Sequence, residues 1–286
     1  EKDIILNAAG EGIVKLDRRG FIEYANEKSL QILQIDSDVL VHTHFDQWFM
    51  GDDDRGVFEH VSEQLQSIKD VQRYRLDAVA NNGELIPVEA ICTTALQQNG
   101  EHAVIVLFQD IVDRVVMEER LMRLANYDSL TGLSNRAYFQ DSLQRAASRS
   151  KRQGSLMSLF TIDLDRFKHV NDTYGHATGD EILIAFAKNI QALLRDSEVF
   201  ARIGGEEFAI IVNNSNIRNS LILANRIHKS ITTIKVLDEQ QKNIHFTISI
   251  GLGIAEEHDT TIDNALQRAD EKLYHAKENG RNRTSH

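Results

Sequence analysis

Acidic side chains in the second half of the chain stand where they could bind a metal ion. Asp163 ends an apolar run that begins at Ser155, and Asp165 follows two residues later. A carboxylate at the end of a buried strand must be paired or metal-bound, because an isolated buried ion is strongly disfavoured. Asp163 is therefore a candidate metal ligand, whereas the alternative, an N-cap for the following helix, suits Asp165 better.

A second pair of acids follows a double glycine, in the segment Gly204-Gly205-Glu206-Glu207. Paired glycines permit a tight hairpin and let a phosphate approach the backbone. Adjacent strand residues point to opposite sides, so at least one glutamate points into a site beside the turn. Taken alone, such a segment is more often an ordinary solvated turn.

Asp163 and the two glutamates together supply hard oxygen ligands of the type that hold Mg²⁺ against a triphosphate. Such ions polarise an α-phosphate, lower the pKa of an attacking 3′-hydroxyl and neutralise a leaving pyrophosphate. The sequence therefore predicts nucleotidyl transfer that depends on Mg²⁺, for which Mn²⁺ is the expected substitute.

The elements that must position these acids alternate between strands and amphipathic helices, which is an α/β pattern. Strands are predicted at 155–163, 198–203, 208–212 and 244–254, and helices at 136–152, 180–195, 217–234 and 262–278.

The first 110 residues show a different pattern, that of an antiparallel sheet of five strands with short helices. The strands are predicted at 12–17, 21–26, 71–80, 86–96 and 103–110, with turns at 18–20, 81–83 and 99–100.

Between the halves, residues 110–126 contain no glycine or proline and predict a continuous helix. Met117, Leu121 and Leu124 follow each other at spacings of four and three, as in a short coiled-coil seam. The alternative is a helix lying on its own domain. We favour a parallel dimer seam, because the function inferred below needs two copies.

Length and composition bound the class of protein. The chain has 286 residues, of which 42% are hydrophobic, enough for two domains with separate cores. Its formal charge of −11 argues against binding DNA or RNA, which needs clustered Lys and Arg. The lone cysteine, Cys92, fits a reducing compartment, so a cytoplasmic location is expected. No apolar run reaches the roughly 20 residues of a membrane span, although a membrane segment could precede Glu1.

Five motifs in the region 128–286 resemble, in order, those of GGDEF-domain diguanylate cyclases. They are 128–136 (DSLTGLSNR), 163–180, 204–208 (GGEEF), 249–251 (SIG) and 269–283. The second motif contains FK at 167–168, ND at 171–172, YGH at 174–176 and GD at 179–180, and the last contains AD at 269–270, Y at 274, AK at 276–277 and GRNR at 280–283. The resemblance implies a nucleotide-cyclase-like central sheet flanked by helices. It also implies a dimer that converts two GTP into cyclic di-GMP and two pyrophosphates.

The same resemblance implies roles for single residues. Catalysis falls to Glu206, Asp163 and Lys168, and metal binding to Asp163, Glu207, Glu206 and the carbonyl of Leu164. Phosphates are held by Lys168, Lys277 and Arg281 with backbone amides near Phe167 and Gly205, and the base is read by Asn171 and Asp180. A carboxylate accepts from guanine N1–H and the exocyclic amine, a donor edge that adenine lacks, so Asp180 favours GTP.

One departure from the family pattern concerns product inhibition. Many of these cyclases carry Arg-x-x-Asp ahead of the glycine pair, and here Arg195 and Glu198 align with it. Arg226 falls where a second product-binding arginine occurs in the family. Either the longer acid accepts from the guanine edge of cyclic di-GMP as the aspartate does, or it misfits that edge, and the sequence favours neither alternative.

The first 110 residues resemble a PAS sensor domain, through their strand order, the opening segment 5–13 and the triplet Tyr24-Ala25-Asn26. The sequence assigns this domain no ligand. Cys92 lacks the flavin-adduct motif, and although His60 could ligate haem, a lone surface histidine is the favoured interpretation.

We therefore expect three parts: a PAS-like sensor domain over 1–110, a signalling helix over 111–127 and a GGDEF domain over 128–286. The expected homodimer forms through the PAS domain and the helix. Two alternatives remain, a catalytically silent receptor for GTP or cyclic di-GMP, and a sensor or interaction module whose output comes from the PAS half.

Overall fold

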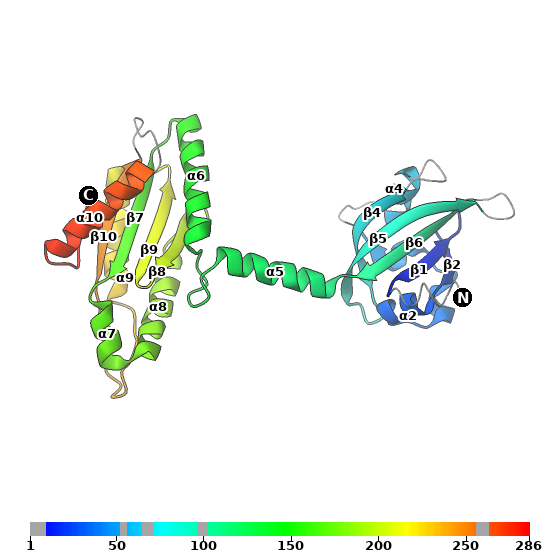
Figure 1. The fold of residues 1–286 in the computed structure, drawn as a ribbon, viewed down its shortest axis with the longest axis horizontal. Coiled ribbons are helices and arrows are strands. Elements are labelled where there is room, and N and C mark those ends of the chain that lie inside the picture. The colour runs from blue at the N-terminus through cyan, green and yellow to red at the C-terminus, as the bar shows by residue number, and fades with distance from the viewer. Residues whose placement is uncertain (1–9, 52–55, 65–70, 97–101, 256–262) are drawn as a thin grey trace. The chain divides into compact units, whose positions relative to one another are not determined.

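The computed structural model describes residues 10–51, 56–64, 71–96, 102–255 and 263–286. Contacts divide the chain into two compact units, Glu1–Arg120 and Leu121–His286. Figure 1 shows both units, each built on its own sheet. The predicted turn at 99–100, most of the opening segment 5–13 and the first residue of the helix predicted at 262–278 lie outside the described residues.

The N-terminal unit is an antiparallel sheet in the order β2-β1-β6-β5-β4-β3. Its strands are β1 (Gly12–Leu16), β2 (Ile22–Ala25), β3 (Phe49–Met50), β4 (Val71–Val79), β5 (Leu85–Leu96) and β6 (His102–Asp110). The five expected strands are present, and the two-residue strand β3 is added at the edge beside β4. Its short helices are α2 (Glu27–Leu33), α3 (Ser37–Leu40), η1 (Phe45–Gln47) and α4 (Val57–Gln64).

The core of this unit lies where the helices meet the sheet. Phe49 stacks on Phe45 with ring centroids 4.3 Å apart and meets the edge of Phe108 at 4.9 Å. Asn26 joins the first hairpin to α2, because its Oδ1 accepts from the N–H groups of Ile13 and Ser29 at 2.8 and 3.0 Å. Its role as a helix cap gives a physical reason for the asparagine in the triplet at 24–26.

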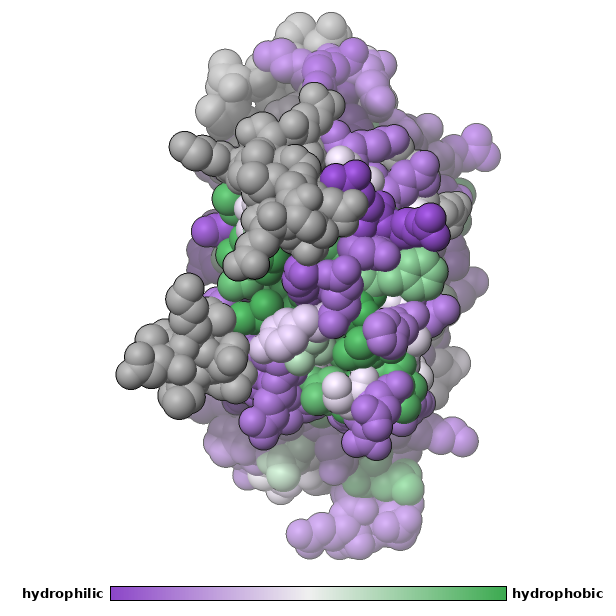
Figure 2. Space-filling view, turned by 90° about the vertical axis from the view of Figure 1, so that its right-hand side faces the viewer, coloured by the Kyte–Doolittle hydropathy of each residue, from purple (hydrophilic) through white to green (hydrophobic). Residues whose placement is uncertain are grey.

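Cys92 lies on β5, as predicted, and is fully buried. Burial raises the pKa of its thiol to about 12, so the thiolate is absent at neutral pH. On the face of this unit seen in Figure 2, hydrophobic side chains are exposed between hydrophilic ones.

Helix α5 (Val112–Asn126) is continuous, as predicted. Its start is fixed by the Asp110 carboxylate, which accepts from Val112 N–H at 2.8 Å, and by a 3.1 Å ion pair from Arg114 to Glu89 on β5. None of the α5 residues is buried, which speaks against the alternative of a helix lying on its own domain. Among the described helices, none combines the length and hydrophobicity needed to cross a membrane.

The C-terminal unit is a mixed sheet in the order β11-β10-β7-β9-β8. Its strands are β7 (Met157–Leu164), β8 (Val199–Gly204), β9 (Glu207–Asn213), β10 (Ile248–Ala255) and β11 (Thr284–Ser285). Only the β10–β11 pair in this sheet is parallel. Its helices are α6 (Arg136–Gln153), α7 (Phe167–Tyr174), α8 (His176–Gln191), α9 (Ile217–Ile231) and α10 (Asp263–Glu278).

Strand β7 is buried on both faces, and its alternating side chains fill two cores. Leu159 packs with Phe139 of α6 and Ala269 of α10 on one face. Phe160 packs with residues of α8 and α9 on the other face. Figure 1 shows α6 and α10 flanking the strands that carry the predicted acids.

Two glycines on β10 let α10 approach the sheet closely. A Cβ at Gly251 would lie 2.0 Å from the carbonyl oxygen of Ala269, and one at Gly253 would lie 2.4 Å from that of Ala265. Only glycine fits at such a distance. This packing matters for function because α10 carries Lys277 and leads into the loop with Arg281.

Candidate active site

Asp163 and Glu207 lie side by side on neighbouring strands. The register of β7 and β9 pairs their Cα atoms, and Leu164 N–H donates to the Glu206 carbonyl at 3.3 Å. The acid that ends β7 and the glutamates of the hairpin therefore meet at one end of the sheet. A one-residue slip in register would turn Asp163 to the opposite face.

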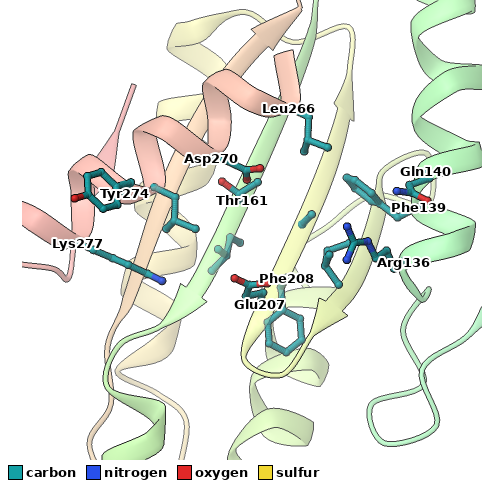
Figure 3. A pocket seen from close by; sticks show the side chains of 14 residues that line it. Arg136, Phe139, Gln140, Thr161, Glu207, Phe208, Leu266, Asp270, Tyr274 and Lys277 are labelled. Atoms are coloured by element: carbon teal, nitrogen blue, oxygen red, sulfur yellow. The ribbon is translucent and has the colours of Figure 1, made fainter. Parts of the chain in front are cut away.

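Lys277 is the cation that faces this acidic cluster. Its Nζ lies 2.7 Å from Oδ2 of Asp163, whose side chain is only 9% exposed. Figure 3 shows Lys277 reaching from α10 toward the sheet. The predicted metal ligand is thus ion-paired to a residue predicted to hold phosphate.

Burial raises the pKa of Asp163, and the charges of Glu206 and Glu207 add to the rise while Lys277 opposes it. One cation therefore faces several carboxylates. A divalent ion at the same place would offset their repulsion.

The donor set suits a hard divalent ion, since it combines carboxylates with the Leu164 carbonyl. Within the described ranges, however, no group of three His, Cys, Asp or Glu side chains is already arranged to hold a metal. Asp163 is engaged with Lys277 instead, so metal binding would require local adjustment of the side chains.

The hairpin that carries the glutamates is fastened by Arg202. Arg202 Nε donates to the Gly205 carbonyl at 2.9 Å, and its Nη1 lies 3.1 and 3.3 Å from the two carboxylate oxygens of Asp128. Gly205 has a φ of +44°, a left-handed conformation in which glycine is least strained. Arg202 thus connects the loop after α5 to the turn before Glu206.

Phe167 and Lys168 form the first turn of α7. Phe167 is buried, whereas Lys168 is exposed. The cap residue Arg166 has a φ of +56° and makes no side-chain cap bond. An uncapped first turn beside an exposed lysine is suited to a phosphate.

Asn171 and Asp180 stand on consecutive helices, α7 and α8. Oδ1 of Asn171 is buried and has no hydrogen-bond partner. Gly179 lets the two helices approach, because a Cβ there would lie 1.9 Å from this oxygen. Asp180 is exposed on α8. An unpaired buried acceptor beside an exposed carboxylate suits a ligand with several N–H donors, such as guanine.

Arg281 lies just beyond α10 in a left-handed conformation with a φ of +59°. Its N–H donates to the Ala276 carbonyl at 3.0 Å, and its side chain is exposed. Arg281 follows Lys277 by four residues, beyond the end of α10 at Glu278.

A cleft of about 340 Å³ between α6 and α10 is lined by two of the predicted site residues, Glu207 and Lys277. In Figure 3, Arg136 and Phe139 approach from α6 and Asp270 from α10, with Thr161 and Glu207 on the strands between them. The cleft reaches Lys277 at one end. Arg136 and Asp270 are therefore further polar residues beside the predicted site.

Burial raises the pKa of Asp270, and the charge of Glu207 adds to the rise. The Thr161 hydroxyl and Arg136 oppose it, although Thr161 Oγ1 makes no hydrogen bond of normal geometry. Sequence reasoning did not assign Asp270 or Arg136 a role, even though both lie within the motifs at 269–283 and 128–136.

The residues of the product-inhibition hypothesis also lie close together. Arg195 N–H donates to Oε2 of Glu198 at 2.9 Å, and Arg226 Nη2 donates to the Leu193 carbonyl at 3.3 Å. One carboxylate oxygen of Glu198, Oε2, is therefore already occupied by a hydrogen bond within its own turn.

Asp165 is not the N-cap that the sequence suggested, since Arg166 occupies that position. The Asp165 carboxylate is buried and accepts hydrogen bonds from Thr247, Ser249 and Asn282. These partners lie more than 80 residues away in sequence, so spacing alone could not reveal them. Arg202, with a partner 74 residues away, was missed for the same reason.

Comparison with protein families assigns both units. Residues 125–283 match the family model described as diguanylate cyclase, GGDEF domain, and residues 10–113 match that of the PAS domain. A Vibrio cholerae protein named diguanylate cyclase is 31% identical over 287 residues, covering 98% of this chain and 87% of that protein.

Two further similarities cover smaller shares of the chain. Diguanylate cyclase DgcS of Shewanella oneidensis is 36% identical over 199 residues, which is 69% of this chain and 62% of that protein. The crystal structure of the coiled coil and GGDEF domain of DgcB from Caulobacter crescentus, in complex with c-di-GMP, superposes with a TM-score of 0.57. Its sequence is 30% identical, and the match covers 61% of this chain and 92% of that one.

Proposed function

Because the chain belongs to the GGDEF family of diguanylate cyclases, we propose that it condenses two GTP molecules into cyclic di-GMP and releases two pyrophosphates. The observation that carries the proposal is the pairing of Asp163 with Glu207 across β7 and β9, with Lys277 at 2.7 Å from Asp163. Acids at one end of a sheet, faced by a phosphate-binding cation, suit nucleotidyl transfer.

The proposed division of work follows from position. Asp163, Glu207 and the Leu164 carbonyl hold Mg²⁺, or Mn²⁺ in its place, and Glu206 is a further ligand or the base for the attacking hydroxyl. When bound, the metal polarises the α-phosphate and offsets the charge of the leaving pyrophosphate.

The protein's own groups bind and orient the nucleotide. Lys277, Arg281 and Lys168 hold the phosphates, with backbone N–H groups near Phe167 and Gly205. Asn171 and Asp180 accept from the guanine edge, which the unpaired Oδ1 of Asn171 supports. Arg195, Glu198 and Arg226 form the proposed site for product inhibition.

Each catalytic domain holds one GTP, so cyclisation requires two domains whose nucleotides face each other for in-line attack. We propose that the chain works as a homodimer through its PAS domain and α5. Met117, Leu121 and Leu124 on α5 are each more than half exposed, which supports a seam with a second copy. Because GTP is supplied in the cytoplasm, the catalytic domain is proposed to act there.

The direct test is incubation of the purified chain with GTP and Mg²⁺, followed by chromatography. The expected products are cyclic di-GMP and pyrophosphate in a ratio of one to two. Asp163→Ala and Glu206→Ala should each abolish product, whereas Glu239→Ala, a matched change at an exposed acid in the same unit, should not. GTP binding without turnover by the unaltered chain would show a silent receptor and overturn the proposal.

A further inference from the structure

Asp165 is a buried carboxylate whose oxygens are both occupied by hydrogen-bond donors. Oδ2 accepts from Thr247 Oγ1 at 2.6 Å and from Asn282 N–H at 3.0 Å. Oδ1 accepts from Ser249 Oγ at 2.7 Å. Asp165 is only 6% exposed. With its lone pairs directed at these donors, it is not placed to act as a metal ligand like Asp163, which lies two residues before it.

These bonds join parts of the chain that are distant in sequence. Ser249 lies on β10 and Thr247 directly precedes that strand, and the Thr247 carbonyl also accepts from Asp165 N–H at 2.8 Å. Asn282 lies in the loop between α10 and β11. Asp165 therefore ties the end of β7 to the last loop of the protein.

That loop has an unfavourable backbone that needs support. Arg281 and Asn282 have φ values of +59° and +48°, in the left-handed region that is unfavourable for non-glycine residues, for arginine more than for asparagine. Such conformations persist only where surrounding contacts hold them. The bond from Asn282 N–H to Asp165 lies one residue from Arg281.

The chain after the loop is held separately. Ile250 N–H donates to the Arg283 carbonyl at 2.9 Å, β11 pairs with β10, and His228 Nε2 lies 3.1 Å from Thr284 Oγ1. Loss of the Asp165 bonds should therefore loosen residues 280–282 while leaving β11 on the sheet.

We propose that Asp165 is a positioning residue, which fixes the loop carrying Arg281 beside the strand that carries Asp163. The inference rests on the proposed function, in which Arg281 binds a phosphate of GTP. Asp165 itself touches no substrate. Asp165 fixes the position of the loop backbone from which the Arg281 side chain extends. A small displacement of a group that binds a phosphate weakens binding strongly.

Positioning by Asp165 and simple charge repulsion by Asp165 predict opposite changes in GTP binding when the carboxylate is removed. A carboxylate near a triphosphate repels it, so removing the charge alone would tighten GTP binding. Removing the hydrogen bonds instead would free Arg281 and weaken binding. Asp165→Asn and Asp165→Ala distinguish the two effects, because asparagine keeps one acceptor oxygen for Thr247 and Asn282, and its amide can donate to Ser249.

The experiment measures KM and kcat for GTP in the full chain. Asp165→Ala should raise KM by about tenfold or more, with a smaller change in kcat, and Asp165→Asn should leave KM near or below that of the unaltered protein. In an Arg281→Ala background, Asp165→Ala should change KM by less than about twofold, because the residue acts through Arg281. Equal effects with and without Arg281 would overturn the proposal.

A second measurement does not depend on activity. Hydrogen exchange at residues 280–282 should speed up in Asp165→Ala, while exchange at the β7–β9 pairs stays slow. Asp238→Ala is the matched control, because Asp238 also accepts backbone N–H groups, from Gln240 and Lys242, in a turn with no assigned role. Unchanged exchange at 280–282 would refute the anchor even if the chain makes cyclic di-GMP. Faster exchange in an inactive chain would support it while the proposed function fails.

Discussion

Among single residues, the atoms without partners say most about the substrate. Oδ1 of Asn171 is a buried polar atom with no hydrogen bond, and Oγ1 of Thr161 is buried with none of normal geometry; such atoms are uncommon because each one costs stability. Both lie beside the proposed site. Asn171 was predicted to read the base, and its free acceptor is what a guanine edge would satisfy.

We predict that Gly179→Ala weakens GTP binding without unfolding the protein. The new Cβ would lie 1.9 Å from Asn171 Oδ1, so the amide must move away from its present position. KM for GTP should rise about tenfold. The new Cβ also lies 3.2 Å from the Phe167 ring, so the higher helix propensity of alanine is offset and the unfolding free energy should change by no more than about 1 kcal/mol. Steady-state kinetics and urea unfolding check both parts. In an Asn171→Ala background the rise in KM should disappear, and its persistence would contradict the explanation.

Asp163 gives a prediction with a definite dependence on pH. Burial raises its pKa, so its ionisation at neutral pH weakens the metal-free fold, and this penalty fades as the pH is lowered through its folded-state pKa. Asp163→Asn should therefore raise the unfolding free energy of the Mg²⁺-free protein by about 1 kcal/mol at neutral pH. The gain should shrink in acid.

Urea unfolding over a pH series measures this difference. Added Mg²⁺ should stabilise the unaltered protein, because a ligand that binds only the folded state shifts the equilibrium toward it, and should not stabilise Asp163→Asn. A variant that is less stable than the original at neutral pH without metal would contradict the interpretation.

At the scale of elements, the hairpin between β8 and β9 depends on a contact with the loop after α5. Arg202 bonds to both Asp128 and Gly205. Although burial raises the pKa of Asp128, bonds from Thr131 and Arg202 outweigh it and hold that pKa below its ordinary value. The stabilisation from Asp128 is thus present above its unfolded pKa and is lost as the pH falls through its folded pKa.

We predict that Arg202→Met lowers kcat by about tenfold or more, because the turn before Glu206 loses its support, and lowers the unfolding free energy by about 1–3 kcal/mol. Arg202→Lys should be intermediate, since one ammonium cannot reproduce the two-sided guanidinium contact. Activity assays and urea unfolding provide the measurement. The difference in unfolding free energy between Arg202→Met and the unaltered protein should become smaller in acid, because protonation of Asp128 removes its ion pair with Arg202. Arg145→Met is the control, because it breaks an exposed ion pair with Asp141 on α6, which contributes little. Equal losses in both variants would count against a special role for Arg202.

The sequence predicted elements well where a periodic pattern was long, and less well where tertiary contacts decide. Helices α6 and α9 begin at Arg136 and Ile217 as predicted, because an asparagine cap precedes each apolar pattern. A helix after Asp165 was expected but no bounds were predicted for α7, since it has eight residues and no side-chain cap. Helix α8 begins at His176 rather than Asp180, and β10 begins at Ile248 rather than Ile244. The meeting of Asp163 with Glu207 depends on strand register, which the motif implied but spacing could not supply.

At the scale of the whole molecule, a PAS unit and a cyclase unit share one continuous helix. We infer that a signal in the PAS unit changes how often two cyclase domains face each other, because a helix with no glycine or proline transmits rotation. The predicted three-part division at 110 and 127 remains a proposal. The boundary between the compact units falls within α5, as expected if this helix belongs to both.

We predict that replacing Met117, Leu121 and Leu124 with glutamine separates the dimer and makes activity depend on protein concentration. The three side chains share one side of α5 and are exposed, so glutamine should spare the helix while removing the seam. Specific activity at low protein concentration should fall by about tenfold or more, as two domains no longer act as one unit. A truncated chain starting at Asp128 should behave in the same way and lose its regulation.

Sedimentation velocity measures the dissociation of the dimer, and initial rates over a range of protein concentration measure how the specific activity depends on it. Met122→Gln is the matched control, because Met122 is also exposed but lies roughly 140° around the helix from Met117. That variant should sediment and turn over like the unaltered chain. If the seam variant stays dimeric and fully active at low concentration, α5 does not hold the two copies together. If only Met122→Gln dissociates, the seam lies on the opposite side of the helix, and the PAS signal would reach the cyclase domains through a different face of α5.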